Sequence, residues 1–566
     1  MSAYMHSRIH SLIAGLALWM GCALMAQAAG DDARKSVINI TTYDADGKLL
    51  KSGNGFYVGE RGEAVALYDL FDGASKAVAI DANGKRHDVS RIIGASDTYD
   101  VVRFRVDTEK NDYLTPAPSQ GTEGAAVEVV PYSVEKKSRP VAARISSVTT
   151  FESYSYYTLD TANEDQYAGC PVTDAAGQVV GIAQKNVTKD AAGLCAIDVR
   201  AATTLSAGTL GYISRDLKAI HIPTALPANE TDALNYIYML GMTRQDSMTH
   251  VTAYADFIAA YPANADIYLE RAKFYASRHD YARSEADIAH VVDEFPDKAA
   301  EAHYVLGRII YEKMTTAPQP PYADWSLEKA LAESQAASQA DNQPLYVMQA
   351  GECQFALKQY DKAYESFLAV TRTPLASSQV FYYAARALEL AGGDSLQILA
   401  LADSAVARCA KPYQHAAAPY LFARASYRVR YGLYREAVTD YNDYADIMGT
   451  SNLNAHFHYL REQAELKGHL YQQALDDIDA AIEKQPGEAL YHMERAVIQI
   501  LVANYEEGLA SAREAMRLAP KDPEGYRLAG LAEGELGRKA QARELLQKAK
   551  ELGSASAEAL IQRYAE

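Results

Sequence analysis

The stretch Asp165-Gln166-Tyr167-Ala168-Gly169-Cys170-Pro171-Val172 places a turn of small residues directly before an apolar segment. Pro171–Thr173 and Val179–Ile182 are predicted as two short strands, because Ala175-Ala176-Gly177 between them supplies a turn. Similar short apolar segments recur back to Ser36, separated by Gly and Asn turns. Many short strands at regular spacing predict a β-sandwich or a β-barrel.

A hairpin is predicted nearer the N-terminus. Asn83-Gly84 stands between Ala77–Ile80 and Val89–Ile93, and both turn residues accept a positive φ. The other predicted strands are Val37–Thr41, Gly55–Val58, Val101–Val106, Ala126–Val130, Val141–Ile145 and Leu194–Ile197.

Several motifs follow one another in a fixed order along residues 36–205. Gly53-Asn54-Gly55-Phe56 comes first, then Gly62–Phe71, then Asp100-Val101-Val102-Arg103-Phe104, then the stretch quoted above, and finally Gly177–Ile182. This order resembles the trypsin-like serine proteases, especially those of the HtrA type. The resemblance implies a trypsin-like double β-barrel in this part of the chain.

The resemblance also implies that the catalytic set is degenerate. Asp69 stands where the family has its histidine, and Ala168 stands where it has its serine. Asp100 keeps the position of the catalytic aspartate. Acyl transfer needs a nucleophile and a base that takes its proton, and alanine has no nucleophilic atom. We therefore expect no catalytic residue here. An active peptidase with an atypical catalytic set is the alternative.

Cys170 lies two residues beyond Ala168 and raises the question of a substitute nucleophile. No histidine follows it before His221, so a base for the thiol is missing. Cys195 begins the next predicted strand, and cysteines on adjacent strands can lie close enough for a disulfide. We expect a Cys170–Cys195 bridge, with a free thiol as the alternative.

From Thr231 to the end, the chain repeats with a period of 34 residues. Pro262 and Pro296 are one period apart, and so are Pro486 and Pro520. A proline at this place ends the helix before it.

Small residues also recur at fixed places in the period. Ala272, Ala496 and Gly530 share one position, where Glu462 is the exception. Two helices approach closely only where the crossing residues are small. The pattern resembles tetratricopeptide (TPR) repeats, which stack because one hairpin cannot bury its apolar face alone. The resemblance implies an all-α superhelical solenoid of about nine hairpins over residues 231–566, with the loop Thr315–Trp325 inserted in the third.

In that family the concave face binds extended or helical peptides, which implies a protein or peptide partner. The resemblance places on this face Leu269, Lys273, Met348, Glu352, Phe355, Phe422, Arg430, Tyr459, Gln463 and Lys467. No charge dominates this set, and it lacks a dense cluster of Lys and Arg. The alternative is that these side chains pack between repeats.

The ends and the composition predict an exported protein. Residues 1–28 have the pattern of a signal peptide that closes on Ala26-Gln27-Ala28, and Cys22 leaves a lipid anchor as a lesser alternative. No later segment is apolar enough for a transmembrane helix. The formal charge of −18 argues against a nucleic-acid partner.

These features predict a multidomain β + α chain. Its parts are a protease-type domain at 31–205, a linker at 206–230 and the repeat domain at 231–566. We expect no metal site or cofactor. The predicted function is binding or scaffolding of proteins in the periplasm or cell envelope, without catalysis.

Overall fold

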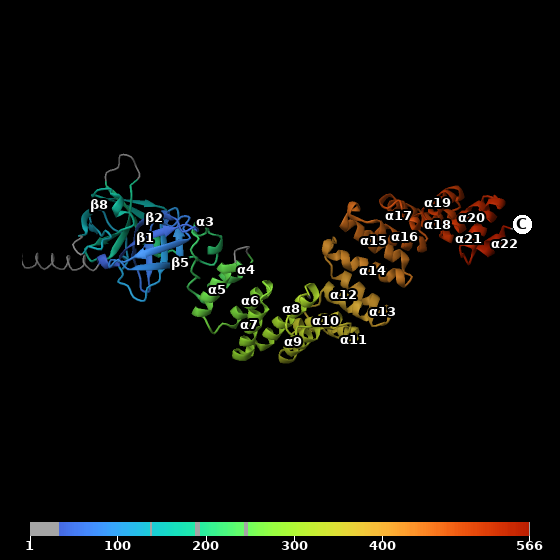
Figure 1. Ribbon diagram of the computed structural model, residues 1–566, viewed down its shortest axis with the longest axis horizontal. Helices are drawn as coiled ribbons and strands as arrows, with labels where there is room; N and C mark the ends of the chain where they lie inside the picture. The colour runs from blue at the N-terminus through green and yellow to red at the C-terminus, as the bar shows by residue number, and fades with distance from the viewer. Residues whose placement is uncertain (1–32, 136–138, 187–192, 243–246, 318, 565–566) are drawn as a thin grey trace, which may run out of the picture. The chain divides into compact units, whose positions relative to one another are not determined.

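A computed structural model describes residues 33–135, 139–186, 193–242, 247–317 and 319–564. The chain divides after Ile267 into two compact units. The first holds all the strands and the second is helical (Figure 1). The predicted signal peptide and Cys22 lie outside the described residues.

The first six strands close into a barrel in the order β1-β2-β3-β6-β5-β4. Alternate residues point inward, so that Ile38, Ile40, Ile92 and Phe104 form its fully buried core. The strands are β1 (Val37–Tyr43), β2 (Leu49–Tyr57), β3 (Glu63–Ala66), β4 (Lys76–Ile80), β5 (Arg86–Ser96) and β6 (Val101–Val106).

The next six strands close a second barrel in the order β10-β11-β12-β9-β8-β7. A shared cluster, which includes Phe56 and Val65 from the first barrel and Ile182 and Ile197 from the second, packs the two barrels together. The double barrel that the sequence predicts is therefore confirmed. The strands are β7 (Ala126–Val129), β8 (Val141–Phe151), β9 (Tyr154–Leu159), β10 (Pro171–Asp174), β11 (Val179–Gln184) and β12 (Leu194–Asp198).

Strand β9 is the one in this barrel that the sequence pattern does not predict. Its buried positions are Ser155, Tyr157 and Leu159. Two of these carry hydroxyl groups, so the alternation of apolar and polar residues does not show in the sequence. The buried hydroxyls have partners, because Ser155 Oγ donates to Gln120 and Tyr157 Oη donates to Asp198.

The segment predicted as a linker, 206–230, packs on the first barrel. Its helix α3 (Arg215–Lys218) contributes Leu217 to the barrel core, together with Ile220 and Ile222. Ile92 N–H donates to Pro223 O at 2.9 Å. The backbone of this segment is therefore hydrogen-bonded to β5.

An ion pair links β5 to the second of the long helices that follow the barrels. Arg91 Nε and Nη2 each donate to the Asp256 carboxylate at 2.7 Å. Asp256 lies on α5 (Ser247–Ala260), which follows α4 (Glu230–Gly241). Both helices fall in the same compact unit as the barrels.

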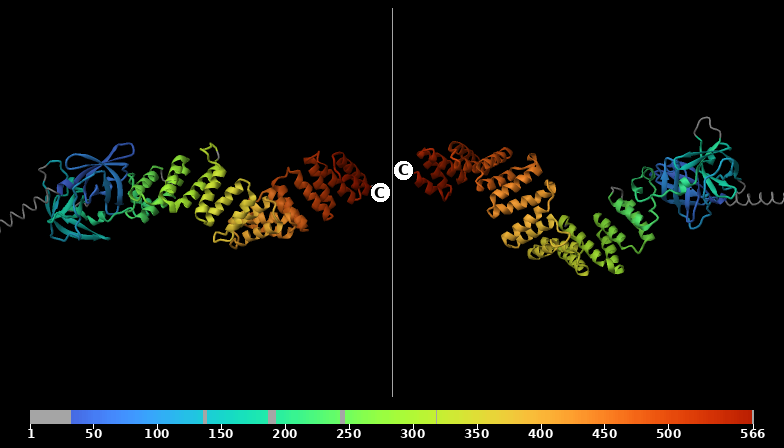
Figure 2. Two further views of the ribbon diagram at one scale, coloured as in Figure 1. Left: turned by 90° about the horizontal axis from the view of Figure 1, so that it is seen from below. Right: turned by 180° about the vertical axis from the view of Figure 1, so that it is seen from behind.

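From residue 230 on, the described residues form nineteen α-helices, which follow one another as nine helix–loop–helix units and a final helix (Figure 2). After α4 and α5 they are α6 (Ala265–Ser277), α7 (Tyr281–Glu294), α8 (Ala299–Thr316), α9 (Leu327–Ala340), α10 (Pro344–Ala356), α11 (Tyr360–Val370), α12 (Ser378–Leu390), α13 (Ser395–Ala407), α14 (Ala418–Arg430), α15 (Tyr434–Met448), α16 (Ala455–Lys467), α17 (Tyr471–Lys484), α18 (Ala489–Leu501), α19 (Tyr505–Leu518), α20 (Pro523–Glu535), α21 (Lys539–Glu551) and α22 (Ala557–Arg563). Among the helices described, none has the length and apolar character that crossing a membrane requires.

The recurring small residues lie where neighbouring helices touch. Ala272 and Ala496 have no exposed surface. A Cβ at Gly530 would lie 2.7 Å from Leu546 Cγ, so only glycine fits without a shift of that side chain. Glu462 occupies the same position in its unit and is also fully buried.

A second repeated feature joins the two helices of several units. An arginine on the first helix binds an acidic residue sixteen positions later on the second helix. The pairs are Arg271–Asp287, Arg424–Asp440 and Arg461–Asp477, and Arg495 binds Ser511 in the same way. The spacing of sixteen positions can be read in the sequence, but the pattern of recurring small residues does not indicate that these side chains form pairs.

Candidate functional site

The turn that carries Ala168 is held against the first barrel. The short helix η3 (Asp165–Tyr167) ends at Ala168, just before β10. Asn54 on β2 donates through Nδ2 to the carbonyl oxygens of Gln166 and Ala168, at 2.9 and 3.1 Å. A single side chain of the first barrel therefore holds both carbonyl groups of the turn that contains the predicted nucleophile position.

Gly169 permits this close approach. Its φ is +80°, and a Cβ built on it would lie 2.1 Å from Asn54 O. Other residues rarely adopt this φ, and the contact is with backbone, which cannot swing away. The glycine is required both by its conformation and by the neighbouring strand.

We expect Gly169→Ala to lower the free energy of unfolding by about 2 kcal/mol or more. The strain of a positive φ in alanine and the clash of its Cβ with the backbone of Asn54 both destabilise the folded state. Gly84→Ala is the matched control, since Gly84 also has φ +80° but no atom within 4 Å of its Cβ position. Urea unfolding of both variants measures the difference. Equal losses in the two variants would show that the contact with Asn54 is unimportant.

The structure brings Asp69 and Asp100 together. Asp69 lies in the short helix η2 (Tyr68–Leu70), and its backbone N–H donates to Asp100 Oδ1 at 2.8 Å. Its own side chain is 71% exposed and accepts from Lys51 Nζ at 2.6 Å. The carboxylate of Asp100 thus binds the backbone at the predicted histidine position.

Asp100 is half-buried at the start of β6. Burial is the main cause that raises the pKa of Asp100 to about 6, and the negative charges of Asp69 and Asp97 also raise it. The hydrogen bond from Asp69 N–H acts in the opposite direction and lowers this pKa. Gln184 on β11 donates through Nε2 to Tyr99 O at 2.9 Å. This contact holds the chain just before Asp100 against the second barrel.

The predicted Cys170–Cys195 bridge is wrong, because both thiols are free. Strand β11 lies between β10 and β12, so the two cysteines are separated by about 9–10 Å across the sheet. Leu194 and Ala196 point into the core of the second barrel with Cys170, and Cys195 between them points to the opposite face.

Cys170 is also unsuited to act as a nucleophile. Burial raises the pKa of the Cys170 thiol to about 12. The reactive species of a cysteine is the thiolate, and this thiol keeps its proton at neutral pH. The side chain has no exposed surface, so it serves as a core residue.

The backbone donor at the nucleophile position is already used. Ala168 N–H donates to Asp165 O at 3.2 Å. In acyl-transfer enzymes, the N–H of the nucleophile stabilises the developing oxyanion, which requires a donor directed at the substrate. The predicted positions Asp69, Asp100 and Ala168 therefore carry two carboxylates and a methyl group. The backbone N–H of Ala168 is hydrogen-bonded within its own turn.

Residues 53–182 match the family model of the trypsin-like peptidase domain. All three positions that the sequence analysis predicts for the catalytic set lie inside this span. Among solved structures, the chain is similar to the serine endoprotease from Yersinia pestis, with 15% identity, a TM-score of 0.27 and coverage of 31% of this chain and 63% of that chain.

Two curated proteins are also similar to parts of the chain. The Protein SGT1 homolog of Bos taurus is 32% identical over 87 residues, which is 15% of this chain and 26% of that protein. The anti-sigma-I factor RsgI9 of Acetivibrio thermocellus is 27% identical over 158 residues, or 27% of this chain and 22% of that protein. The chain thus spans about a quarter of the length of the curated relatives that it matches.

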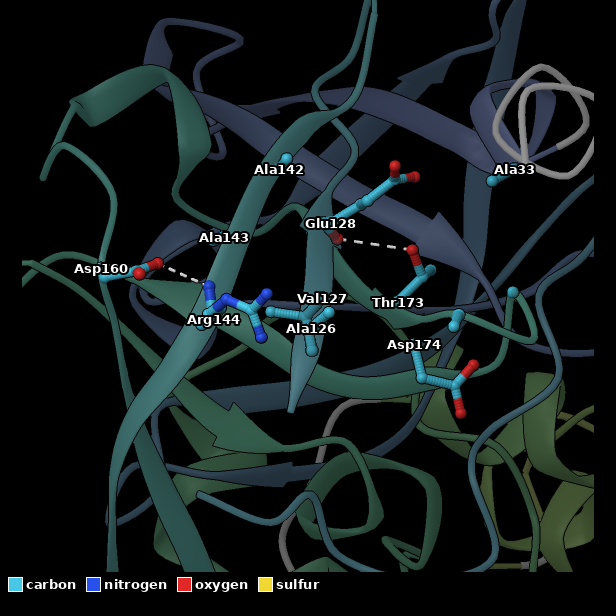
Figure 3. Close-up of a pocket in the computed structure, with 12 residues that line it drawn as sticks. Ala33, Ala126, Val127, Glu128, Ala142, Ala143, Arg144, Asp160, Thr173 and Asp174 are labelled. Carbon is cyan, nitrogen blue, oxygen red and sulfur yellow. Dashed lines mark hydrogen bonds between the residues drawn. The ribbon is translucent and has the colours of Figure 1, made fainter. Parts of the chain in front are cut away.

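A hollow of about 430 Å³ lies on the second barrel, lined by β7, β8 and β10 (Figure 3). Small side chains such as Ala126 and Ala142 leave the space. Arg144 N–H donates to the carboxylate of Asp160 at its edge. The lining has charges of both signs but contains no histidine or cysteine, and Asp69, Asp100 and Ala168 do not belong to it.

Most of the predicted groove residues are engaged within the helical array. Leu269 is 1% exposed, and Met348, Phe355, Phe422 and Tyr459 pack on cores between neighbouring helices. The polar members contact other side chains: Lys273 with Glu270, Glu352 with Arg308, Arg430 with Glu389, Gln463 with Glu462, and Lys467 with the ring of Tyr434. A binding role for these residues stays a prediction.

Two of the predicted groove residues lie beside one cavity. Lys273 is in its lining, and Glu352 binds Arg308, which is also in the lining. Arg308, Tyr304 and Lys313 are lining residues that sequence reasoning missed. No motif marks them, since only the stacking of α6 on α8 brings them together with Lys273.

Proposed function

We propose that this chain is an exported, non-catalytic relative of the trypsin-like peptidases, and that its TPR array binds protein segments in the cell envelope. The observation that carries the non-catalytic part is the state of the Ala168 turn. No nucleophilic atom stands at this position, and its N–H donates to Asp165 O. A site in this state lacks the attacking group, and the N–H at its nucleophile position is already used within the turn.

The geometry at Asp69 supports the same conclusion. A histidine base takes the proton of the nucleophile and is itself held by the aspartate. Here Asp100 accepts the Asp69 backbone N–H, and the Asp69 side chain binds Lys51 in solvent. The aspartate therefore has a structural partner in place of an imidazole.

The proposed TPR role rests on the repeat of 34 residues and on the burial of its small residues. Ala272, Ala425 and Ala496 are fully buried where helices cross. Such arrays present long surfaces on which peptides lie. The proposed export rests on the pattern that closes on Ala26-Gln27-Ala28.

We expect the purified full chain to show no turnover above background on a fluorogenic peptide library, and no labelling by a fluorophosphonate serine probe. Ala168→Ser alone should also remain unlabelled, because Asp69 cannot replace an imidazole as base and acid. An active trypsin-like protease serves as the positive control. Turnover by the wild-type chain that is lost on changing Gln166 or Asp100 would instead support a peptidase with an atypical catalytic set.

A further inference from the structure

The hollow on the second barrel lies over the outer face of β7 and β8 (Figure 3). Its volume of about 430 Å³ falls in the range of sites that bind small molecules. Burial alternates along both strands: Val127 and Ala143 belong to the barrel core, and the residues on either side of them face outward. A ligand therefore reaches the hollow from solvent without entering the core.

The register of the two strands sets four outward side chains in a square. Glu128 on β7 lies opposite Ala142 on β8. Ala126 on β7 lies opposite Arg144 on β8. The two charged residues therefore occupy one diagonal and the two alanines occupy the other. Diagonal neighbours on one face of a sheet lie about 7–8 Å apart, and the short alanine side chains leave the space between the charged ones open.

Among the residues that the structure describes, neither charged side chain of this square forms an ion pair. The Arg144 guanidinium donates through Nη1 to Gly124 O at 3.2 Å. A guanidinium has five N–H donors, so this contact leaves others for a ligand. Glu128 accepts from Thr173 Oγ1 through its backbone oxygen, which leaves its carboxylate for a ligand.

Two further carboxylates line the hollow, and both bind backbone donors. Asp160 accepts from Arg144 N–H. Asp174 Oδ1 accepts from Ala176 N–H and Gln178 N–H, each at 2.9 Å, and so holds the turn between β10 and β11. Backbone donors do not cancel the charge of a carboxylate. The described lining therefore has a negative net charge, which attracts an ammonium group, and its one guanidinium is the place for a carboxylate.

The rest of the described lining is mostly small and apolar. Its methyl groups belong to Ala33, Ala126, Ala142 and Ala175. A short apolar group that lies on this surface leaves water, which favours its binding. The lining thus combines an anionic end, a cationic end and an apolar surface.

We propose that this hollow binds a small zwitterion, a free α-amino acid with an apolar side chain. The carboxylate of the ligand binds the Arg144 guanidinium, its ammonium group binds the Glu128 carboxylate, and its side chain lies on the alanines. Hydrogen bonds between such charged groups are about 2.8 Å long, so an α-carbon with its two charged groups spans the diagonal. Neither the Ala168 turn nor the helical array takes part in this site.

Saturation-transfer NMR with the full chain and L-leucine at pH 6.5 tests the site. Leucinamide lacks the carboxylate of the probe, and N-acetyl-leucine lacks its ammonium group. We expect L-leucine to bind with a Kd of about 1–10 mM and each blocked probe to bind at least about three-fold more weakly, because exposed ion pairs contribute modestly. Equal binding of the three probes, or no binding of L-leucine, overturns the inference and leaves the proposed function unaffected.

Two variants test the two ends of the ligand separately. Arg144→Gln should bind L-leucine no better than leucinamide, because the partner of the carboxylate is gone. Glu128→Gln should bind L-leucine no better than N-acetyl-leucine. Arg105→Gln removes an exposed arginine on β6 of the first barrel and should keep the wild-type order of the probes. The same loss in Arg105→Gln, or the wild-type order in the other two variants, overturns the assigned contacts.

Ala142→Leu tests whether the ligand occupies the hollow. Ala142 is exposed on β8, so a larger side chain fills the space without entering the barrel core. We expect this variant to lose binding of L-leucine and to keep the thermal unfolding curve of the wild type. Thr150→Leu makes a similar change at an exposed position of β8 outside the hollow and should bind normally. Normal binding by Ala142→Leu, or equal loss in both variants, overturns the placement.

Discussion

Glu462→Gln is expected to flatten the pH dependence of stability in the C-terminal repeats. In the wild-type chain, the free energy of unfolding of this region should fall by several kcal/mol between pH 5 and pH 8, and in the variant by about half as much, because Glu465 still has a raised pKa. Urea unfolding at both pH values, with hydrogen exchange of α16 and α17 as the local probe, measures the effect.

The physical cause is a carboxyl group at a position that other units fill with Ala or Gly. Glu462 has no exposed surface, and its Oε1 has no hydrogen-bond partner among the described residues. Burial raises the pKa of Glu462 to about 8. Glu465, one turn later, also has a buried oxygen without a partner among these residues, and burial raises its pKa to about 9.

The sign follows from proton binding in the two states. Below an ordinary glutamate pKa of about 4.5, Glu462 is protonated in both the folded and the unfolded chain. As the pH rises toward 8, the unfolded chain releases the proton and the folded chain retains it. The contribution of Glu462 to stability therefore falls over this window and levels off above pH 8, where this carboxyl group is ionised in both states.

The surroundings of Glu462 contain charges of both signs. Arg461 and His458 on α16 bind Asp477 on α17, and Glu494 approaches from α18. Glu483→Gln is the control, since Glu483 is exposed on the same hairpin. A wild-type chain with constant stability from pH 5 to pH 8, or a Glu462→Gln variant with the wild-type slope, would contradict this account.

Asp440→Ala is expected to lower the free energy of unfolding of the α14–α15 region by about 3–5 kcal/mol. Asp440 is 1% exposed and binds Arg424 Nη2 at 2.7 Å and Arg428 Nη1 at 2.8 Å. Its removal leaves two largely buried guanidinium groups without this carboxylate. Thermal unfolding followed by circular dichroism, with hydrogen exchange of α14, measures the loss.

The expected loss in the free energy of unfolding is the cost of leaving two buried arginines without their carboxylate. It does not measure the net contribution of the ion pair to stability. Burial raises the pKa of Asp440 in spite of both neighbouring guanidinium groups, so the pair is costly to desolvate. Asp403→Ala is the matched control. Asp403 binds the same two arginines at 3.1 and 3.2 Å, but it is 47% exposed, and we expect a loss below about 1 kcal/mol. Equal losses in the two variants would contradict the argument.

Features that depend on local pattern could be predicted from the sequence. The Asn83-Gly84 turn joins β4 to β5, and the insertion before Trp325 separates α8 from α9. Strand β9 could not be predicted, because buried hydroxyl groups interrupt its apolar alternation. The prediction of a bridge between Cys170 and Cys195 was wrong for a different reason. The order of the strands and the direction of their side chains are set by the closed barrel and cannot be read from the sequence.

The candidate site divides in the same way. The prediction that Ala168 and Asp69 occupy the serine and histidine positions of the family rests on residue identity and spacing, which need no coordinates. The hydrogen bond from Asp69 N–H to Asp100 depends on the closure of the first barrel, and the two from Asn54 to the Ala168 turn depend on the docking of the two barrels. The cavity beside Lys273 depends on the stacking of repeat units.

The sequence by itself determined the succession of a β-domain and helical repeats. Apolar residues alternate with a period of two in the strands, and the helical part repeats every 34 residues, so both patterns can be read directly from the order of residue types. It also determined that Ala168 has no group that can attack a substrate. Only the tertiary structure decided that Asn54 binds the carbonyl groups of the Ala168 turn, that Cys170 is a core residue, and that Arg308 and Lys313 lie in one cavity with Lys273. These properties arise where segments far apart in the chain pack together, and burial and charge at such contacts are set by all the neighbours at once.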